Sequence, residues 1–566
     1  MSNYYDTSNP TGGGNILPLT PEVKQAHMAA IMNGQPIVGI ASMTNLRNFP
    51  VTDCFQGRQV SLSYHTISTD NGGGIFIWDD SNTNGDNNGT IIKPTNYTGI
   101  GRWVRLESIF KPSFVNIVWF GARVNSVGFN NGPIINAAIQ SLPLYASTNL
   151  VINGGYMRNG TCYIPGGTWY TDIGIVASGG MTLYGDGPAK TTIAMNVNAP
   201  GFTSATPKSI LSASLSAVPN VSSYSYAMNL SVSNHGVPVG NLTTGWITGL
   251  SGFDSGYINS WQRVKAVAPD MLQVLFSGSG TYTLSSASIE LDSLVVDFQI
   301  DPYNISMNNT FGSVCRDIQI IGNSGGGNLG SSGLYIAGAQ QSYLYNVTVG
   351  GMGLRGAICD VAADKLWCSS SIKGPGYMCT AGPCIENGLI HSEHHNQNKS
   401  GTIYTMKLFD GTVVPRPAFY IRGATGWRAR QCQGEDSSWE MIIDNCPKVT
   451  VDKFVVNGPG VTNRDGWETT MIYIRGDSYD FEFDKTFFFG TFKNLVNDQS
   501  LLSISQGENG IYDNFTKVRT RNGSLTYTPN ASLLGPFTND SSAAAKKVPI
   551  GAAYLKTDGT VVWRMS

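Results

Sequence analysis

The chain has 566 residues, of which 67 are glycine and only 13% are charged, and its formal net charge is −2. This length exceeds one ordinary hydrophobic core, so the chain is predicted to form several modules or one elongated all-β repeat. The near-neutral charge argues against nucleic-acid binding, and the lack of any apolar stretch of membrane-spanning length argues against membrane insertion.

The first hundred residues combine a polar start with short strands and turns. A glycine-rich stretch opens the chain, and no basic region followed by an apolar run indicates export, so synthesis in the cytoplasm and release by lysis are expected. Further on come NGGGIFIWDD (Asn71 to Asp80) and GIGRWVRL (Gly99 to Leu106). Their glycines and aromatic residues are predicted to form turns and a small core.

The next segment changes from a strand to one short helix and then back to strands. VWFGARVNSVGFNNGPIINAAI begins at Val118 and predicts a strand followed by an amphipathic helix. GTCYIPGGTWYTDIGIVASGGMTLYGDG then predicts short strands separated by glycine-rich turns. A helix that caps a stack of short strands is typical of the start of a parallel β-helix.

A repeat follows after a serine-rich region of alternating strands, which is predicted to be an insertion of β-hairpins. Strand-like pieces place Asn346, Cys368 and Ile390 at constant steps of 22 residues, a spacing that predicts one turn of a β-helix. The polar segment 396–417 interrupts this spacing and is predicted to be a long loop on one rung.

These motifs resemble those of bacteriophage tailspikes that depolymerise capsular polysaccharide. The resemblance rests on the order WFGA, capping helix, IPGGTWY and LYGDG, on the GGGIFIWD and GRWVR pair, and on the C-terminal VPIGAAYLKTDGTVVWR. It implies an all-β, right-handed parallel β-helix of the pectate-lyase type, a homotrimer, a place in the virion tail, and attachment to a tail or adaptor protein through the N-terminus. The chain departs from the usual acidic run after FGA and has NSVGFNNGP instead.

The expected domain organisation follows these segments. It comprises a virion attachment peptide (1–40), a head module (41–110), the capping helix and first strands (111–200), an inserted β-hairpin subdomain (201–300), the β-helix with the catalytic face (301–490) and a C-terminal β region for trimerisation (491–566).

The acidic residues of the repeat are the catalytic candidates. Glycoside hydrolysis uses two carboxyl groups, and a β-helix stacks equivalent positions about 4.8 Å apart. Once the long loop is removed, Glu393 aligns within a residue or two with Glu435 and Asp436, while Asp364 and Glu386 are 22 residues apart. Close stacking of two acids raises the pKa of one, as a general acid requires. Retention and inversion of configuration both stay open.

Residues near these acids are the candidates for substrate binding. Aromatic rings can stack on pyranose faces, and arginine can pair with a carboxylate-bearing sugar. The candidates are His391, His394, His395, Trp367, Tyr377, Tyr404, Trp427, Arg422 and Arg428, with Trp439 nearby. Adjacent histidines on an extended strand point to opposite faces, and no further ligand set is evident, so neither a metal nor a cofactor is expected. The acids can instead be solvated turn residues or ion-pair partners of the arginines.

Three readings of the function stay open. The first is an endo-hydrolase of a bacterial capsular polysaccharide. The second is a polysaccharide lyase, in which Arg422, Arg428, His391 or Tyr377 would matter more than paired acids. The third is a spike that binds capsule or lipopolysaccharide without cutting it. The nine cysteines are expected to be reduced and mostly buried.

Overall fold

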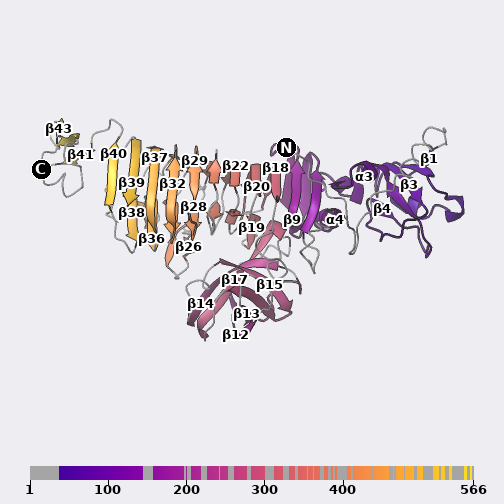
Figure 1. Ribbon diagram of the computed structural model, residues 1–566, viewed down its shortest axis with the longest axis horizontal. Helices are drawn as coiled ribbons and strands as arrows, with labels where there is room; N and C mark the ends of the chain where they lie inside the picture. The colour runs from indigo at the N-terminus through magenta and orange to yellow at the C-terminus, as the bar shows by residue number, and fades with distance from the viewer. Residues whose placement is uncertain are drawn as a thin grey trace.

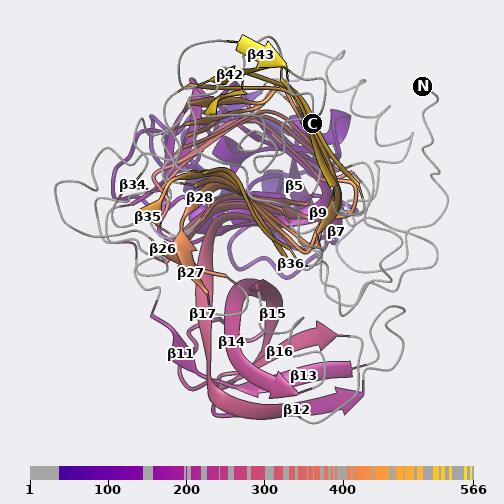
Figure 2. The same cartoon turned by 90° about the vertical axis from the view of Figure 1, so that its left-hand side faces the viewer.

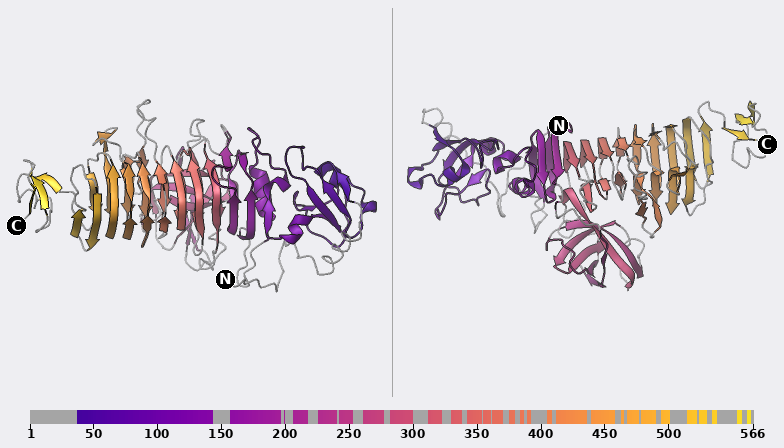
Figure 3. Two further views of the ribbon diagram at one scale, coloured as in Figure 1. Left: turned by 90° about the horizontal axis from the view of Figure 1, so that it is seen from above. Right: turned by 180° about the vertical axis from the view of Figure 1, so that it is seen from behind.

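A computed structural model shows an elongated molecule in which a small head, a stack of strands and a C-terminal group of strands follow one another along one axis (Figures 1 and 3). The structure describes residues 37–143, 157–196, 199, 206–217, 226–240, 242–252, 261–276, 282–299, 312–322, 330–337, 342–353, 355–360, 362–369, 375–379, 384–386, 389–391, 405–408, 412–435, 439–457, 463–464, 467–476, 478–489, 494–500, 514–521, 524–529, 534–537, 553–556 and 561–563. Most of the predicted attachment peptide, residues 1–36, lies outside this set.

The head is a five-stranded sheet with the order β1-β2-β3-β5-β4. Trp78 and Trp103 are cross-strand partners whose ring centroids are 5.4 Å apart. The guanidinium of Arg105 is buried and donates to the backbone oxygens of glycines 72, 73 and 89. The glycines and aromatics of this region therefore form turns and a small core, as predicted. Its elements are β1 (Val38–Ile40), α2 (Met43–Arg47), η1 (Val51–Asp53), β2 (Gln59–Leu62), β3 (Gly74–Asp79), β4 (Ile91–Ile92), β5 (Arg102–Arg105) and α3 (Leu106–Phe110).

A short helix, α4 (Gly132–Gln140), lies at the start of the strand stack, where the sequence predicts a cap. It has proline in its first turn and buries Ile135, Ala138 and Ile139 against the first strands. Gly121 ends the preceding 3₁₀ turn with φ of 89°, a conformation that favours glycine. The neighbouring elements are β6 (Phe114–Asn116), η2 (Ile117–Phe120), β7 (Met157–Ile164), β8 (Gly167–Thr171), β9 (Ile175–Gly185) and β10 (Thr191–Met195).

The stack is a parallel β-helix, which confirms the predicted fold class. Each rung pairs in parallel with the next, and a rung has three faces. Face 1 contains β19 (Ser331–Ala337), β21 (Arg355–Asp360), β23 (Tyr377–Cys379), β28 (Pro417–Arg422), β31 (Trp439–Asp444), β36 (Thr470–Gly476) and β38 (Asn494–Ser500).

A bend divides the remaining strands into face 2, before the bend, and face 3, after it. Asp317, Asn346 and Lys365 occupy the bend on successive rungs with φ of 58°, 51° and 55°. The strands that cross the bend are β18 (Val314–Ile321), β20 (Tyr343–Gly350), β22 (Ala362–Ser369) and β37 (Tyr479–Phe489). Elsewhere the two faces are separate strands, namely β24 (Cys384–Glu386) and β25 (Leu389–His391), β29 (Arg428–Arg430) and β30 (Gln433–Glu435), and β32 (Pro447–Asp452) and β33 (Val455–Asn457).

The predicted step of 22 residues is right for one pair of rungs and wrong for another. Cys368 and Ile390 are Cα partners, as predicted. The partner of Cys368 on the preceding rung, however, is Val349 rather than Asn346, so that step is 19 residues. Asn346 is a bend residue, and the connection from face 3 to face 1 differs in length between rungs, so a constant sequence step does not hold.

Antiparallel strands form a subdomain beside the first rungs, as the serine-rich alternation predicts (Figure 2). The long strand β17 (Tyr282–Gln299) begins in this subdomain and ends in face 1, where it pairs with β9 and β19. Arg355 of face 1 pairs with the buried Asp292, and Arg263 pairs with Asp297. The other strands are β11 (Lys208–Ser209), β12 (Ser212–Ala217), β13 (Tyr226–Ser231), β14 (Leu242–Gly252), β15 (Trp261–Ala268) and β16 (Met271–Phe276).

The strands after the last rungs turn antiparallel, because β39 pairs in that sense with both β37 and β40. This region comprises β39 (Asn514–Arg521), β40 (Ser524–Pro529), β41 (Leu534–Phe537), β42 (Ala553–Lys556) and β43 (Val561–Trp563). Its predicted role in trimerisation stays a prediction.

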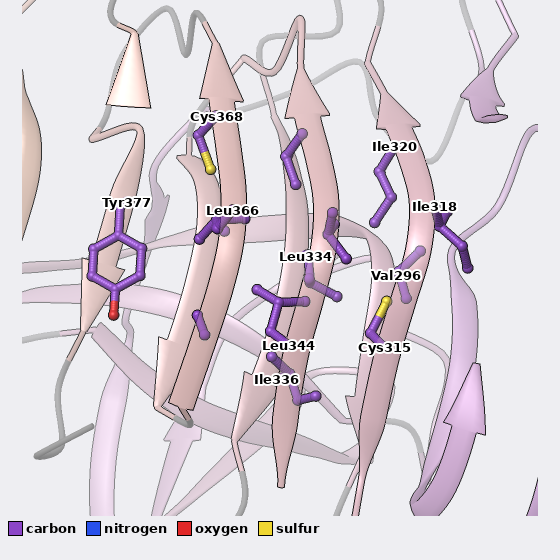
Figure 4. Packing of buried hydrophobic residues seen from close by; sticks show 14 of the residues in the cluster. Val296, Cys315, Ile318, Ile320, Leu334, Ile336, Leu344, Leu366, Cys368 and Tyr377 are labelled. Carbon is purple, nitrogen blue, oxygen red and sulfur yellow. The ribbon is translucent and has the colours of Figure 1, made fainter. Parts of the chain in front are cut away.

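The core runs along the inside of the β-helix. Inward side chains from successive rungs stack on one another, among them Leu334, Leu344 and Leu366 (Figure 4). Six of the seven cysteines whose side chains are described are buried, and none forms a disulfide. Burial raises the pKa of the Cys446 thiol to about 12, as expected for a reduced core residue. Among the helices of the described residues, none has the length and apolar character needed to span a membrane.

Candidate functional site

The candidate site lies where face 3 of one rung continues into face 1 of the next. The predicted long loop leaves this corner after β25 and returns at β28. It contains a hairpin of β26 (Thr405–Lys407) and β27 (Val413–Pro415). Met406, Leu408 and Val414 of this loop pack on the outer side of face 1, in one cluster with Tyr420 and Trp439. A second hairpin, β34 (Asn463–Arg464) with β35 (Trp467–Glu468), leaves the same corner two rungs later.

The register brings His391 and Glu435 to neighbouring positions on face 3. They are Cα partners on β25 and β30, and the same column continues to Ser369 on the rung before and Asn457 on the rung after. Parallel strands lie about 4.8 Å apart, so residues in this column can contact one ligand. Glu435, rather than Glu393, therefore pairs directly with the β25 strand, because Glu393 comes two residues after His391.

Asp364 and Glu386 are Cα partners on face 2, as their spacing predicts. Glu386 pairs next with Arg430, which lies 3.7 Å from Asp452. The ammonium of Lys365 donates to the Tyr345 hydroxyl at 2.9 Å, and this bond raises the pKa of Lys365. Acidic and basic residues therefore alternate along this column of face 2.

The two acidic pairs occupy separate places. Glu386 and His391 are five residues apart in sequence, on face 2 and face 3 respectively. A chain of five residues spans up to about 17 Å, and a glycosidase pair needs a separation of about 5–9.5 Å. Each pair thus forms its own candidate centre, and the corner at Glu435 is the one beside the long loop.

Two predicted substrate-binding aromatics are wrong, because the structure places them inside the β-helix. Tyr377 and Trp427 are each 0% exposed and belong to the central core. Tyr377 pairs with Ala357 and Phe419, both inward, and its ring centroid is 6.5 Å from that of Trp427 (Figure 4). Both rings therefore support the rungs and do not reach a ligand on the outside.

Arg422 has a partner that the sequence analysis missed. Its Nε lies 3.9 Å from the buried carboxylate of Asp444, which also lies 3.3 Å from Nε of Arg475 and accepts a hydrogen bond from the Tyr420 hydroxyl. Burial and the Asp444 charge raise the pKa of Tyr420 well above its usual value. Arg422 and Asp444 are 22 residues apart and are Cα partners, so the rung spacing itself was the available signal.

The remaining predicted binding residues differ in exposure. Arg428 is exposed on face 2, and Trp367 is half-buried on β22. Trp439 is 7% exposed and packs against Tyr473, at a centroid distance of 4.5 Å, and against Trp467. Glu393, Asp436, His394, His395 and Tyr404 lie outside the described residues, and of Glu386, His391 and Glu435 only the backbone positions are used above. No group of three potential metal ligands occurs in the part of the chain that the structure describes.

A stack of aromatic and cationic side chains on face 2 also escaped the sequence analysis. Tyr163, Tyr184, Arg316 and Tyr345 are successive Cα partners. The Arg316 guanidinium lies 5.3 Å from the Tyr184 ring centroid and 5.4 Å from that of Tyr345. Because neighbours cover the ring faces and Lys365 covers the far side of Tyr345, the stack holds the rungs together rather than offering faces to sugars.

Comparison with known proteins identifies the head. Residues 39–108 match the family described as the phage tail protein small four-stranded β-sheet domain. This range begins in β1 and ends in α3, so it corresponds to the sheet built around Trp78 and Trp103. No curated protein matches the sequence.

Several solved structures are similar to the chain at low identity. The enzymatically active domain of tailspike protein 2 from bacteriophage CBA120 is 13% identical, with a TM-score of 0.42, over 84% of this chain and 58% of that one. WceF of Pantoea stewartii, a glycan biofilm modifying enzyme, is 12% identical, with a TM-score of 0.41, over 89% and 55%. Tailspike gp49 of Acinetobacter baumannii bacteriophage Fri1, a capsular polysaccharide depolymerase, is 11% identical, with a TM-score of 0.35, over 84% and 77%. The chain spans little more than half the length of the first two.

Proposed function

We propose that this chain is a phage tailspike that binds a bacterial capsular polysaccharide and hydrolyses glycosidic bonds within it. The observation that supports this most is the presence, in one chain, of a phage tail β-sheet domain at residues 39–108 and a long parallel β-helix with acids at stacked positions. A tail protein meets the host surface, where a capsule is the outermost barrier, and cutting that capsule lets the virion approach the outer membrane.

The catalytic centre that we favour is the corner at Glu435. One carboxyl group protonates the leaving oxygen and another acts as nucleophile or activates water. We assign these roles to Glu435 with Glu393 or Asp436, because the long loop leaves the β-helix beside them. Asp364 and Glu386 form the second candidate pair, and their placement on adjacent rungs suits the separation of about 5 Å used by retaining enzymes.

The same proposal includes the assembly. The chain forms a homotrimer through residues 491–566, attaches to a tail or adaptor protein through residues 1–40 and is located in the virion tail. The head sheet that matches a phage tail domain lies next to this attachment peptide in the chain, which supports the placement at the N-terminal end.

The test is incubation with a panel of capsular polysaccharides, with measurement of new reducing ends and of the ultraviolet absorbance of unsaturated uronates. A hydrolase yields reducing ends without absorbance on one capsule type. Reducing ends with absorbance would instead establish a lyase, and neither signal on a capsule that the protein binds would establish a non-catalytic spike.

The catalytic assignment is tested by Glu435→Gln and Glu393→Gln, each expected to lower the cleavage rate at least about 100-fold while binding persists. Glu468→Gln, on the exposed hairpin of the same corner, is the matched control and should retain the rate. Full activity of Glu435→Gln together with loss in Glu386→Gln would move the centre to face 2.

A further inference from the structure

Glu440 is an acidic residue inside the β-helix, next to the corner at Glu435. It lies on β31, is 0% exposed and has the core residue Met441 as its neighbour. A buried carboxylate is costly in an apolar interior, and such residues recur at functional sites.

The column of residues that contains Glu440 otherwise holds small or apolar residues. The pairings of face 1 place it after Gly333, Gly356, Gly376 and Ala418 on earlier rungs and before Met471. This corner has little room, because a Cβ on Gly356 would lie 2.2 Å from the backbone oxygen of Gly376. A glutamate is therefore the exception in this column.

Space for the Glu440 side chain comes from a glycine on the same rung. Gly434 occupies an inward column in which the neighbouring rungs have Cys368, Ile390 and Val456. A Cβ at Gly434 would lie 2.6 Å from Oε2 of Glu440, so the carboxylate lies against the backbone of Gly434. The residue after Gly434 is Glu435, and only residues 436–438 separate β30 from β31.

We propose that Glu440 is a positioning residue that joins the two ends of the turn carrying Glu435 and Asp436 and sets their charge state. The inference rests on the proposed function for its catalytic meaning, although its electrostatic part does not. The charged residues on the strands bordering Glu440 are Glu435 and Asp436 on its own rung and the buried Arg416 just before β28. A negative charge at Glu440 disfavours ionisation of the nearby acids, which keeps one of them available as a proton donor.

The decisive variant is Glu440→Gln, which keeps the shape of the side chain and removes its charge. Two unit charges about 10 Å apart at an effective dielectric constant of about 20 change a titration midpoint by roughly one pH unit. Loss of the Glu440 charge should therefore move the titration of Glu435 and Asp436 to lower pH by about that amount. Peptide mass spectrometry after carbodiimide labelling across a pH series measures this without any substrate. Glu468→Gln is the control and should leave the midpoint unchanged.

Activity supplies a second readout, since both limbs of the pH profile of kcat/KM should move to lower pH in Glu440→Gln. If Glu440→Gln does not fold, the double variant Glu440→Ala with Gly434→Ile restores the residue types found at Ala418 and Ile390 on the preceding rung, and it should show the same shift in labelling. Lower thermal stability with an unchanged labelling midpoint would overturn the proposal. A wild-type protein that cleaves no capsule would overturn the proposed function instead, while the labelling result would still decide the role of Glu440.

Discussion

Breaking the ion pair between Arg355 and Asp292 should release the inserted subdomain from the β-helix. Nη1 of Arg355 lies 2.5 Å and 2.6 Å from the two carboxylate oxygens of Asp292, and the two side chains are 9% and 0% exposed. The guanidinium also lies 5.3 Å from the Trp246 ring of the subdomain, and Thr244 donates to Asp292. Removing one member leaves the other charge buried, which costs about 3–5 kcal/mol. Arg355→Met, which keeps an apolar contact with Trp246, should therefore destabilise the junction by that amount.

The assay is native-state hydrogen exchange of the peptides that contain β14, β15 and β17, because local opening free energies are defined even when global unfolding is not two-state. The double variant Arg355→Met with Asp292→Leu should recover most of the loss, since no charge remains unpaired. Arg430→Met is the matched control, because the Arg430–Asp452 pair is 56% and 31% exposed and should contribute at most about 1 kcal/mol. A loss in Arg355→Met no larger than in this control would refute the reasoning.

Two further predictions concern the core and the head. Tyr377→Ala should cost about 3–5 kcal/mol by opening a cavity, whereas Tyr377→Phe should retain both glycan affinity and cleavage; a loss of binding in the phenylalanine variant, measured by titration calorimetry, would return Tyr377 to the binding site. The head should lose stability on acidification: burial lowers the pKa of His65 below 6.5, so the unfolded state binds more protons as pH falls below that value. Burial alone would raise the pKa of Asp70, but four backbone N–H groups hold it below 3.8, so its contribution is lost below that pH. Hydrogen exchange of residues 59–79 should show this, and His65→Asn should remove the first phase only.

Local patterns were sufficient to predict several parts of the fold. Alternation and turn residues identified the head strands around Trp78 and Trp103, the proline-led helix α4 and the antiparallel insertion, because each depends on neighbours close in sequence. The step of 22 residues predicted the pairing of Asp364 with Glu386 and of Cys368 with Ile390, since those two rungs have the same length. It failed at Asn346, where a different turn length changes the register.

The sequence alone determined that the chain forms stacked parallel rungs with acids on neighbouring turns, because strand period and rung length are encoded locally. Only the tertiary structure decided which side chains face inward. Tyr377 and Trp427 read as sugar-binding aromatics until the bends of each rung placed them in the core. The contact of Glu440 with Gly434 joins two faces of one rung across a turn, and Asp444 lies between arginines of adjacent rungs. Such contacts depend on how three faces close on one another, and residue spacing along one strand does not determine that closure.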